Sequence, residues 1–175
     1  MQLDARDMTA VAVACVAMVT DLRSGKVRNV LTIPAILLGF ALNGLLEGDA
    51  GLLRSLQGLG VSALLLGLSV GFGGALGGGD IKLLAAIGAL GGPVFLITAF
   101  CIAAPIGGVI AGVVAARHRQ FIASCTRCFT WIAFKLGTGT AVPLLGAKGS
   151  LRVPYAVAIA GGVIGAVAWR ATPLA

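Results

Sequence analysis

The stretch Gly77-Gly78-Gly79-Asp80-Ile81-Lys82-Leu83 places a carboxylate and an ammonium group between two long apolar segments. Glycines in succession interrupt the apolar run before them, and the next apolar run begins at Ile81. Hydrophobic residues make up 58% of the 175 residues and charged residues only 11%. A soluble domain has about twice that charged fraction. The composition therefore predicts an all-α, polytopic membrane protein, folded as a single domain over residues 1–175.

Apolar runs along the chain predict a bundle of about six transmembrane helices, because a helix needs about 20 residues to cross the hydrocarbon core. The fourth of these runs is short, and the fifth begins at a proline. Between the fifth and the sixth we expect a loop with one interfacial helix, around Cys128 to Leu136. The expected spans are Leu3 to Ser24, Val30 to Leu46, Leu53 to Leu76, Asp80 or Ile81 to Leu90, Pro93 to Ala116, and Val153 to Trp169.

The basic residues divide unequally between the two sides of this bundle. Ten fall on one side and three on the other, which places the first side in the cytoplasm and both termini outside. The net charge of +7 is therefore a topology signal, and we expect no nucleic acid partner. The ten are Arg23, Lys26, Arg28, Lys82, Arg117, Arg119, Arg127, Lys135, Lys148 and Arg152, and the three are Arg6, Arg54 and Arg170.

The six carboxylates divide the opposite way. Asp21 and Asp80 are the only two on the cytoplasmic side, so any chemistry that needs two carboxylates at that face depends on them. A carboxylate at the edge of the hydrocarbon is energetically costly, which makes each a candidate functional group. The four on the outer side are Asp4, Asp7, Glu47 and Asp49.

The charged residues Asp21, Asp80 and Lys82 could each also have a purely structural role. Asp80 could cap the fourth helix, or the glycines before it could let a substrate backbone approach the carboxylate. A side chain at Gly79 would stand between the two, and alanine would be disfavoured there if the turn has positive φ. Asp21 could be an ordinary helix-end residue, although the helix dipole disfavours an anion at a C-terminus. Lys82 could steer or pair with an aspartate, or only extend to the membrane interface.

Other polar and small residues give weaker signals. Cys125, Cys128 and His118 supply at most three ligands, whereas a structural zinc ion usually has four, so we expect no metal and no cofactor. Glycines four residues apart in apolar runs predict close helix packing. These pairs are Gly67 and Gly71, Gly88 and Gly92, Gly108 and Gly112, and Gly161 and Gly165.

Three segments resemble, in order, the motifs of the type IV prepilin peptidases. Asp21 to Asn29 is similar to the first catalytic segment, which runs from an aspartate through polar residues to Ile-Pro-Asn, but Arg28 stands where the family has proline. Gly77 to Leu83 is similar to the G-x-G-D motif followed by a hydrophobic residue, Lys and Leu. Val153-Pro154-Tyr155-Ala156 is similar to the segment that opens the last helix.

The resemblance implies a membrane aspartic endopeptidase that cleaves the leader peptide of prepilins or pseudopilins at the cytoplasmic face of the inner membrane. It implies Asp21 and Asp80 as the catalytic pair, Gly77 to Gly79 as a substrate-access loop and Lys82 as a supporting residue. The partners it implies are the substrate and membrane lipid. The length is similar to the short form, associated with Flp-type tight-adherence pili, which lacks the methyltransferase domain between the first two helices.

A small proton-coupled transporter is the alternative, because it would also keep two membrane carboxylates and glycine-broken helices. Its carboxylates would lie nearer the bilayer midplane. Asp21 and Asp80 both fall near one face, which favours the peptidase. Which aspartate acts as acid and which as base stays open, because the titration of a coupled pair belongs to both groups.

Overall fold

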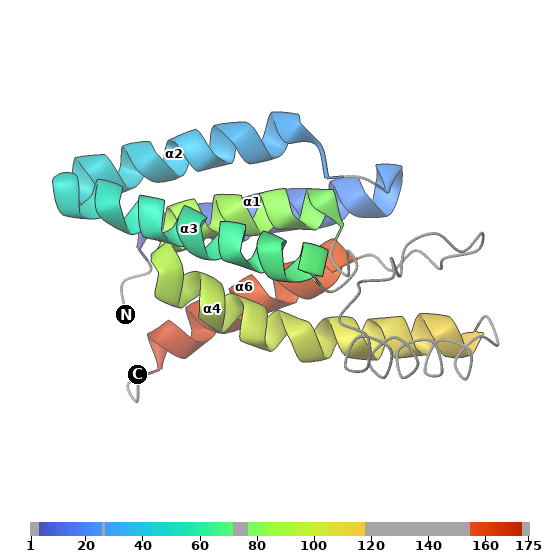
Figure 1. Ribbon diagram of the computed structural model, residues 1–175. Coiled ribbons are helices and arrows are strands. Elements are labelled where there is room, and N and C mark those ends of the chain that lie inside the picture. Colours follow the sequence, from blue (N-terminus) through green and yellow to red (C-terminus); the bar gives the residue numbers. More distant parts are fainter. Residues whose placement is uncertain (1–3, 26, 72–76, 118–154, 173–175) are drawn as a thin grey trace.

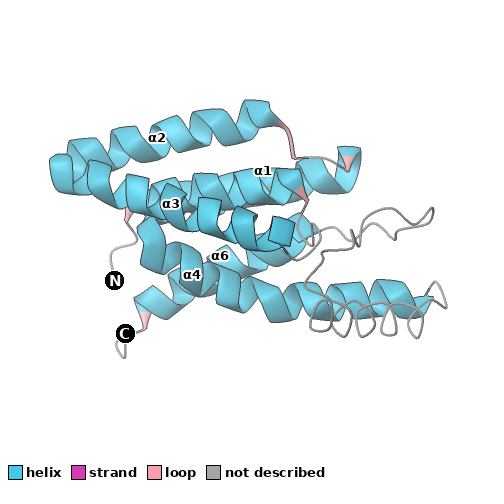
Figure 2. Cartoon of the chain, viewed as in Figure 1, coloured by secondary structure: helices cyan, strands magenta, loops and turns pink. Residues whose placement is uncertain are grey.

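The computed structural model describes residues 4–25, 27–71, 77–117 and 155–172 (Figure 1). Every element in the described part of the chain is a helix, and Figure 2 shows only helices and loops there. The expected all-α class is confirmed. The helices are α1 (Ala5–Ser24), α2 (Asn29–Glu47), α3 (Asp49–Gly71), α4 (Gly78–Arg117) and α6 (Tyr155–Ala171).

Three of the described helices are long and apolar enough to cross a membrane: Asn29–Glu47, Asp49–Ser69 and Gly78–Val114. Only 22% to 28% of these apolar stretches is buried inside the protein, so most of their apolar surface faces outward. Val30 and Leu45 of α2, for example, are 82% and 85% exposed. Such a surface suits lipid rather than water. The count of six spans stays a prediction.

The turn between α2 and α3 is shorter than the sequence suggested. Gly48 alone separates the two helices, with φ 61° and ψ −136°. Only glycine adopts this backbone conformation readily. As a result α3 begins at Asp49, four residues before the expected start at Leu53. The expected end of that helix, Leu76, lies outside the described residues.

The expected fourth and fifth helices are two arms of α4, joined at Gly92. This residue has φ 82° and ψ 179°, far from helical values, and Pro93 follows it directly. From this break the first arm (residues 78–91) and the second arm (residues 93–117) run in opposite directions (Figure 1). The proline predicted the start of the second arm correctly.

Side chains from three other helices satisfy the carbonyl groups that this break releases. Pro93 has no N–H to donate to the Ala89 carbonyl, and the last carbonyls of any helix need partners outside it. Asn43 Nδ2 of α2 donates to the carbonyl oxygens of Ala89 at 2.9 Å and Leu90 at 3.2 Å. Ser55 of α3 also donates to Ala89 O, at 2.9 Å.

Arginines surround the next carbonyl. Gly91 O accepts from Arg54 at 3.4 Å and from Arg170 at 3.2 Å. The guanidinium of Arg170 also lies 4.4 Å from the centre of the Phe95 ring, which is a favourable cation–π geometry. Cations stabilise a helix C-terminus, so these arginines help to hold the end of the first arm.

Ion pairs join the same end of the bundle. Arg6 pairs with Asp4 and Glu47, both at 2.6 Å, and Arg170 with Asp7 at 3.0 Å. Arg54 also pairs with Glu47, at 3.1 Å. The three arginines and these three acids are groups that the sequence assigned to the non-cytoplasmic side. The structure brings them together at one end, called here the arginine end.

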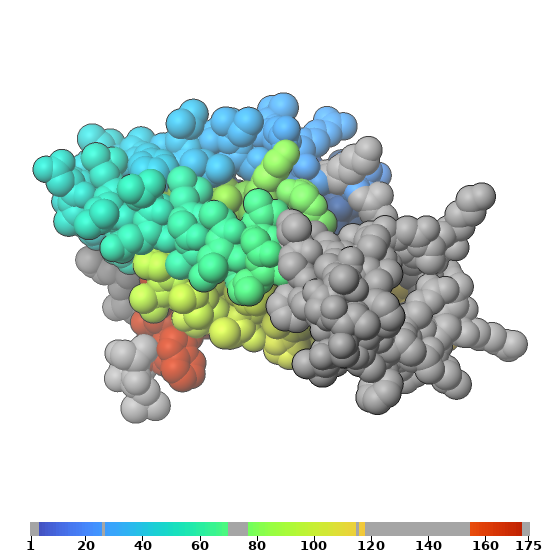
Figure 3. Space-filling model, viewed as in Figure 1, coloured from blue at the N-terminus to red at the C-terminus, as the bar shows by residue number. Residues whose placement is uncertain are grey.

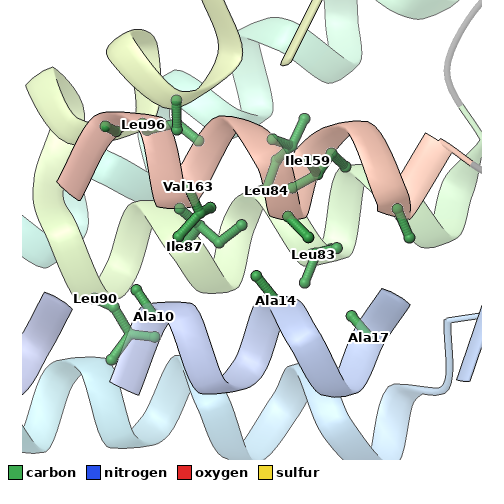
Figure 4. Close-up of a cluster of buried hydrophobic side chains, with 14 of the residues drawn as sticks. Ala10, Ala14, Ala17, Leu83, Leu84, Ile87, Leu90, Leu96, Ile159 and Val163 are labelled. Carbon is green, nitrogen blue, oxygen red and sulfur yellow. The ribbon is translucent and has the colours of Figure 1, made fainter. Parts of the chain in front are cut away.

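The core lies between α1, the first arm of α4 and α6 (Figure 4). Three alanines of α1 share one helix face, because they are three or four residues apart. Their small side chains let the backbone of α1 approach its neighbours. This core connects the helix that carries Asp21 to the arm that carries Asp80. Its members include Ala10, Ala14, Ala17, Leu83, Leu84, Ile87, Leu90, Ile159 and Val163.

Glycines bring α3 and α6 against α4. A Cβ on Gly58 would overlap the backbone of Gly88, and one on Gly162 would overlap the carbonyl of Ala99. Gly88 belongs to one of the predicted pairs, and close packing there is confirmed. Within the described part of the chain, a Cβ on Gly67 or Gly108 would have nothing within 4 Å, so close packing is not found at these two positions. Figure 3 shows part of the outer surface that α2 and α3 form.

Candidate active site

A cleft of about 310 Å³ lies at the end of the bundle opposite the arginine end. It brings together Asp21 and Asp80, which are 59 positions apart in the chain. The residues that line it include every site candidate that the sequence selected. They are Asp21, Gly25, Val27, Gly77, Gly78, Gly79, Asp80 and Lys82.

Asp21 enters the cleft from the last turn of α1. The helix ends at Ser24 because Gly25 takes a left-handed conformation, φ 63° and ψ 23°. The N–H of Gly25 donates to the carbonyl oxygen of Asp21 at 2.7 Å, which satisfies one of the last carbonyls of the helix. The side chain of Asp21 is partly exposed. The carboxylate therefore stands at a helix C-terminus and within reach of water.

Asp80 enters from the first turn of α4. Gly77 precedes the helix, and its carbonyl accepts the N–H of Asp80 at 3.0 Å and of Ile81 at 3.2 Å. Asp80 is thus the third residue of α4 and does not occupy the capping position that the purely structural interpretation gave it. An anion in the first turn is favoured by the helix dipole. This position keeps the carboxylate partly exposed at the cleft.

The three glycines before Asp80 differ in their surroundings. A Cβ on Gly77 would lie 2.9 Å from Asp80 Oδ2, so the absence of a side chain makes room for the carboxylate. Among the residues that the structure describes, a Cβ on Gly78 would meet nothing within 4 Å, and one on Gly79 would lie 3.3 Å from Val27 Cβ. Among the described glycines, positive φ occurs at Gly25, Gly48 and Gly92. The suggestion of positive φ at Gly79 is therefore wrong.

Lys82 lies at the rim of the cleft with an exposed side chain. Its Nζ donates to Asn29 Oδ1 at 2.9 Å. Asn29 is the first residue of α2, and the sequence did not select it as a site residue. Asn29 could have been selected from the sequence, because it is the last residue of the segment that begins at Asp21.

Tyr155 is a second residue that was missed. It opens α6, and its phenol is close enough to Asp80 for the two groups to interact electrostatically. The second arm of α4 makes room for the ring, since a Cβ on Gly107 would run into Tyr155. Tyr155 could have been selected from the sequence, because it belongs to the Val153 to Ala156 segment that resembles a family motif.

Several predictions concern residues outside the described ranges. Among them are Lys26, His118, Cys125, Cys128 and the interfacial helix expected around Cys128 to Leu136. Within the described ranges, no group of three or more His, Cys, Asp or Glu side chains could hold a metal ion.

The apolar helices and the cleft with two carboxylates at one end define a helical membrane protein with an acidic site. Residues 8–112 match the type IV leader peptidase family, and the chain belongs to that family. The family implies a peptidase. The matched region contains every residue that lines the cleft. Neither the curated proteins nor the solved structures contain a significant match to this chain.

Proposed function

We propose that this chain is an aspartic endopeptidase of the inner membrane, with Asp21 and Asp80 as its catalytic pair. It would cleave the leader peptides of prepilins or pseudopilins at the cytoplasmic face. The main support for this proposal is that both carboxylates line one cleft in a member of the leader peptidase family.

The chemistry follows from the properties of two neighbouring carboxyl groups. Like charges close together are unfavourable, so the pair shares one proton. The ionised member takes a proton from water while the protonated member donates a hydrogen bond to the scissile carbonyl. Attack by water gives a tetrahedral intermediate, and return of the proton to the nitrogen releases the amine.

The glycines before Asp80 would admit the substrate. A peptide must lie extended, with its backbone within hydrogen-bond reach of the carboxylates. Side chains at Gly77 to Gly79 would occupy that space, and Gly78 already opens onto free volume at the cleft. Lys82, at the rim, is the supporting residue of this proposal.

The position of the cleft suits a substrate with a cytoplasmic leader. Arg23, Arg28 and Lys82 belong to the more basic side of the bundle, and all three are exposed near the cleft end. By the distribution of basic residues this end faces the cytoplasm. A leader peptide on that side, followed by an apolar helix in the membrane, would present its cleavage site at the edge of the hydrocarbon.

The connection between α1 and α2 supports the short form of the family. Only residues 25–28 separate the two helices, so no methyltransferase domain is inserted there. We expect a mature pilin with a free N-terminal amine in a host with no other processing enzyme. The association with Flp-type tight-adherence pili belongs to the same proposal.

The structure gives no support to the transporter alternative. Asp21 lies in the last turn of α1 and Asp80 in the first turn of α4, at helix ends. A transporter keeps its coupling carboxylates near the bilayer midplane. Co-expression of the chain with a candidate prepilin tests the function directly, since cleavage produces a shorter product on a gel. No product from any prepilin of the same source would contradict the proposal.

A further inference from the structure

We propose that Lys82 and Asn29 are positioning residues whose hydrogen bond fixes the separation of the two aspartates. The bond holds the segment that follows Asp21 against the first turn of α4, which carries Asp80. This inference rests on the proposed function of the cleft, and it assigns a role to a contact that no motif explains.

The Lys82 side chain points in a direction that suits a positioning role. Lys82 follows Asp80 by two residues, which is about 200° around an α-helix. The two side chains therefore leave α4 on different sides. Lys82 crosses instead to α2, where Nζ donates to Asn29 Oδ1 at 2.9 Å, across 53 positions of sequence. The bond is exposed to solvent, so we assign it a role in geometry rather than in stability.

Val27 supplies a second contact between the same two segments. It lies in the connection between α1 and α2, is only 9% exposed and belongs to the main core. A Cβ on Gly79 would lie 3.3 Å from Val27 Cβ, so Val27 packs directly on the turn before Asp80. The chain after α1 is thus held to α4 at Val27 in the connection and again at Asn29, the first residue of α2.

These contacts act on Asp21 because of its place in the chain. Asp21 lies one turn before the connection begins at Gly25, and Gly25 is itself hydrogen-bonded to Asp21 O. A shift of the connection away from α4 would move the last turn of α1 with it. Catalysis by a carboxyl pair is sensitive to such a shift, since a misplacement of about 1 Å can lower a rate by about 100-fold.

Lys82 has two other possible roles, which predict different results. Its positive charge could stabilise the carboxylates directly, or it could bind the substrate. The other charged or titratable groups described at this end are Arg23, Arg28, Arg117 and Tyr155. All four stay unchanged in the variants of Asn29 and Lys82, and only the control variant replaces Arg28.

The experiment compares cleavage of a prepilin peptide by purified wild type, Asn29→Ala, Lys82→Met and the double variant. Lys82→Arg retains a charged donor of similar reach, and Arg28→Met removes a neighbouring exposed cation as the control. We expect each of the first two variants to lower kcat by at least about 10-fold with KM changed by less than about 2-fold. The double variant should lose no more than either single variant. Lys82→Arg and Arg28→Met should retain most of the activity.

The dependence of kcat on pH separates positioning from charge. If the two residues position the pair, Asn29→Ala and Lys82→Met should change the dependence of kcat on pH in the same way, because both break the same hydrogen bond. A charge effect would move both limbs of the profile to higher pH in Lys82→Met and leave Asn29→Ala unchanged. That result would overturn the inference, and so would a change in KM alone or additive losses in the double variant.

Infrared spectra of the carboxyl groups give a readout without substrate. Asp21→Asn and Asp80→Asn identify the bands of the pair. Because Asn29→Ala and Lys82→Met break the same hydrogen bond, we expect both variants to shift these bands in the same way. Such a shift in a protein that cleaves no prepilin would support the positioning role and contradict the proposed function. Unchanged bands in a protein that cleaves normally would contradict the positioning role alone.

Discussion

Gly77 and Asp80 are so close that a Cβ atom on Gly77 would lie 2.9 Å from Oδ2 of Asp80. Gly77 directly precedes α4, and its carbonyl accepts the N–H of Asp80. The glycine therefore makes room for one particular orientation of the carboxylate. The glycines before Asp80 therefore have different roles, which alanine substitutions can distinguish.

Gly77→Ala should reduce cleavage strongly, by about 10-fold or more, because the new methyl group displaces the Asp80 carboxylate. The variant should still insert and accumulate, since alanine at a helix start introduces no buried polar group. Immunoblotting of membranes and a cleavage assay measure the two properties. A variant that cleaves at the wild-type rate would contradict the role of Gly77.

Gly78→Ala tests substrate access without a clash inside the protein. A Cβ on Gly78 meets nothing within 4 Å, yet it would project at the cleft. We expect normal accumulation and about 10-fold less cleavage, if the substrate backbone needs this space. Gly108→Ala is the matched control, because its Cβ also has nothing within 4 Å and Gly108 does not line the cleft. Equal activity of Gly78→Ala and Gly108→Ala would contradict the proposal that the substrate backbone needs the space beside Gly78.

Asn43→Leu should lower the free energy of unfolding by about 1 to 3 kcal/mol, because it leaves the buried Leu90 carbonyl without its side-chain donor, whereas Ala89 O keeps its bond from Ser55. Asn43 is fully buried and donates to Leu90 O and Ala89 O at the break in α4. Denaturant unfolding in detergent measures the change. Ser62→Ala is the control, since that buried hydroxyl donates to Gly58 O of its own helix. Equal stability of the two variants would show that other groups cap the break.

The topology follows from labelling at two exposed positions after the native cysteines are replaced. Ala50 lies near the arginine end and Arg28 near the cleft. An impermeant thiol reagent added to intact cells should label Ala50→Cys, and should label Arg28→Cys only after permeabilisation. The reverse pattern would put the aspartates on the side opposite the leader peptide.

The sequence predicted the elements whose signals are local. Pro93 marked the start of the second arm, and the apolar runs predicted helices in the correct order. Asp21 and Asp80 were selected because carboxylates are rare and costly at a membrane edge. The distribution of charge placed both on one side of the bundle, and the structure adds that they line the same cleft.

The remaining features depend on contacts between distant residues. The bond from Lys82 to Asn29 joins two helices across 53 positions, and nothing local specifies the partner. Gly67 and Gly108 share the four-residue spacing of packing glycines but have no close neighbour among the described residues, because spacing does not say which helix face meets a neighbour. The single-residue turn at Gly48 was missed because apolar periodicity does not encode φ.

Replacement of each aspartate by asparagine tests whether Asp21 and Asp80 form the catalytic pair. Asp21→Asn and Asp80→Asn preserve size and remove one ionisable carboxyl group of the pair. Asp49→Asn, in the first turn of α3 at the other end of the bundle, is the matched control. In cells that co-express a prepilin, we expect both site variants to accumulate in the membrane and leave the precursor uncleaved, with a rate loss of about 100-fold to 10,000-fold. Asp49→Asn should process it normally. Substantial cleavage by either site variant would contradict the catalytic pair.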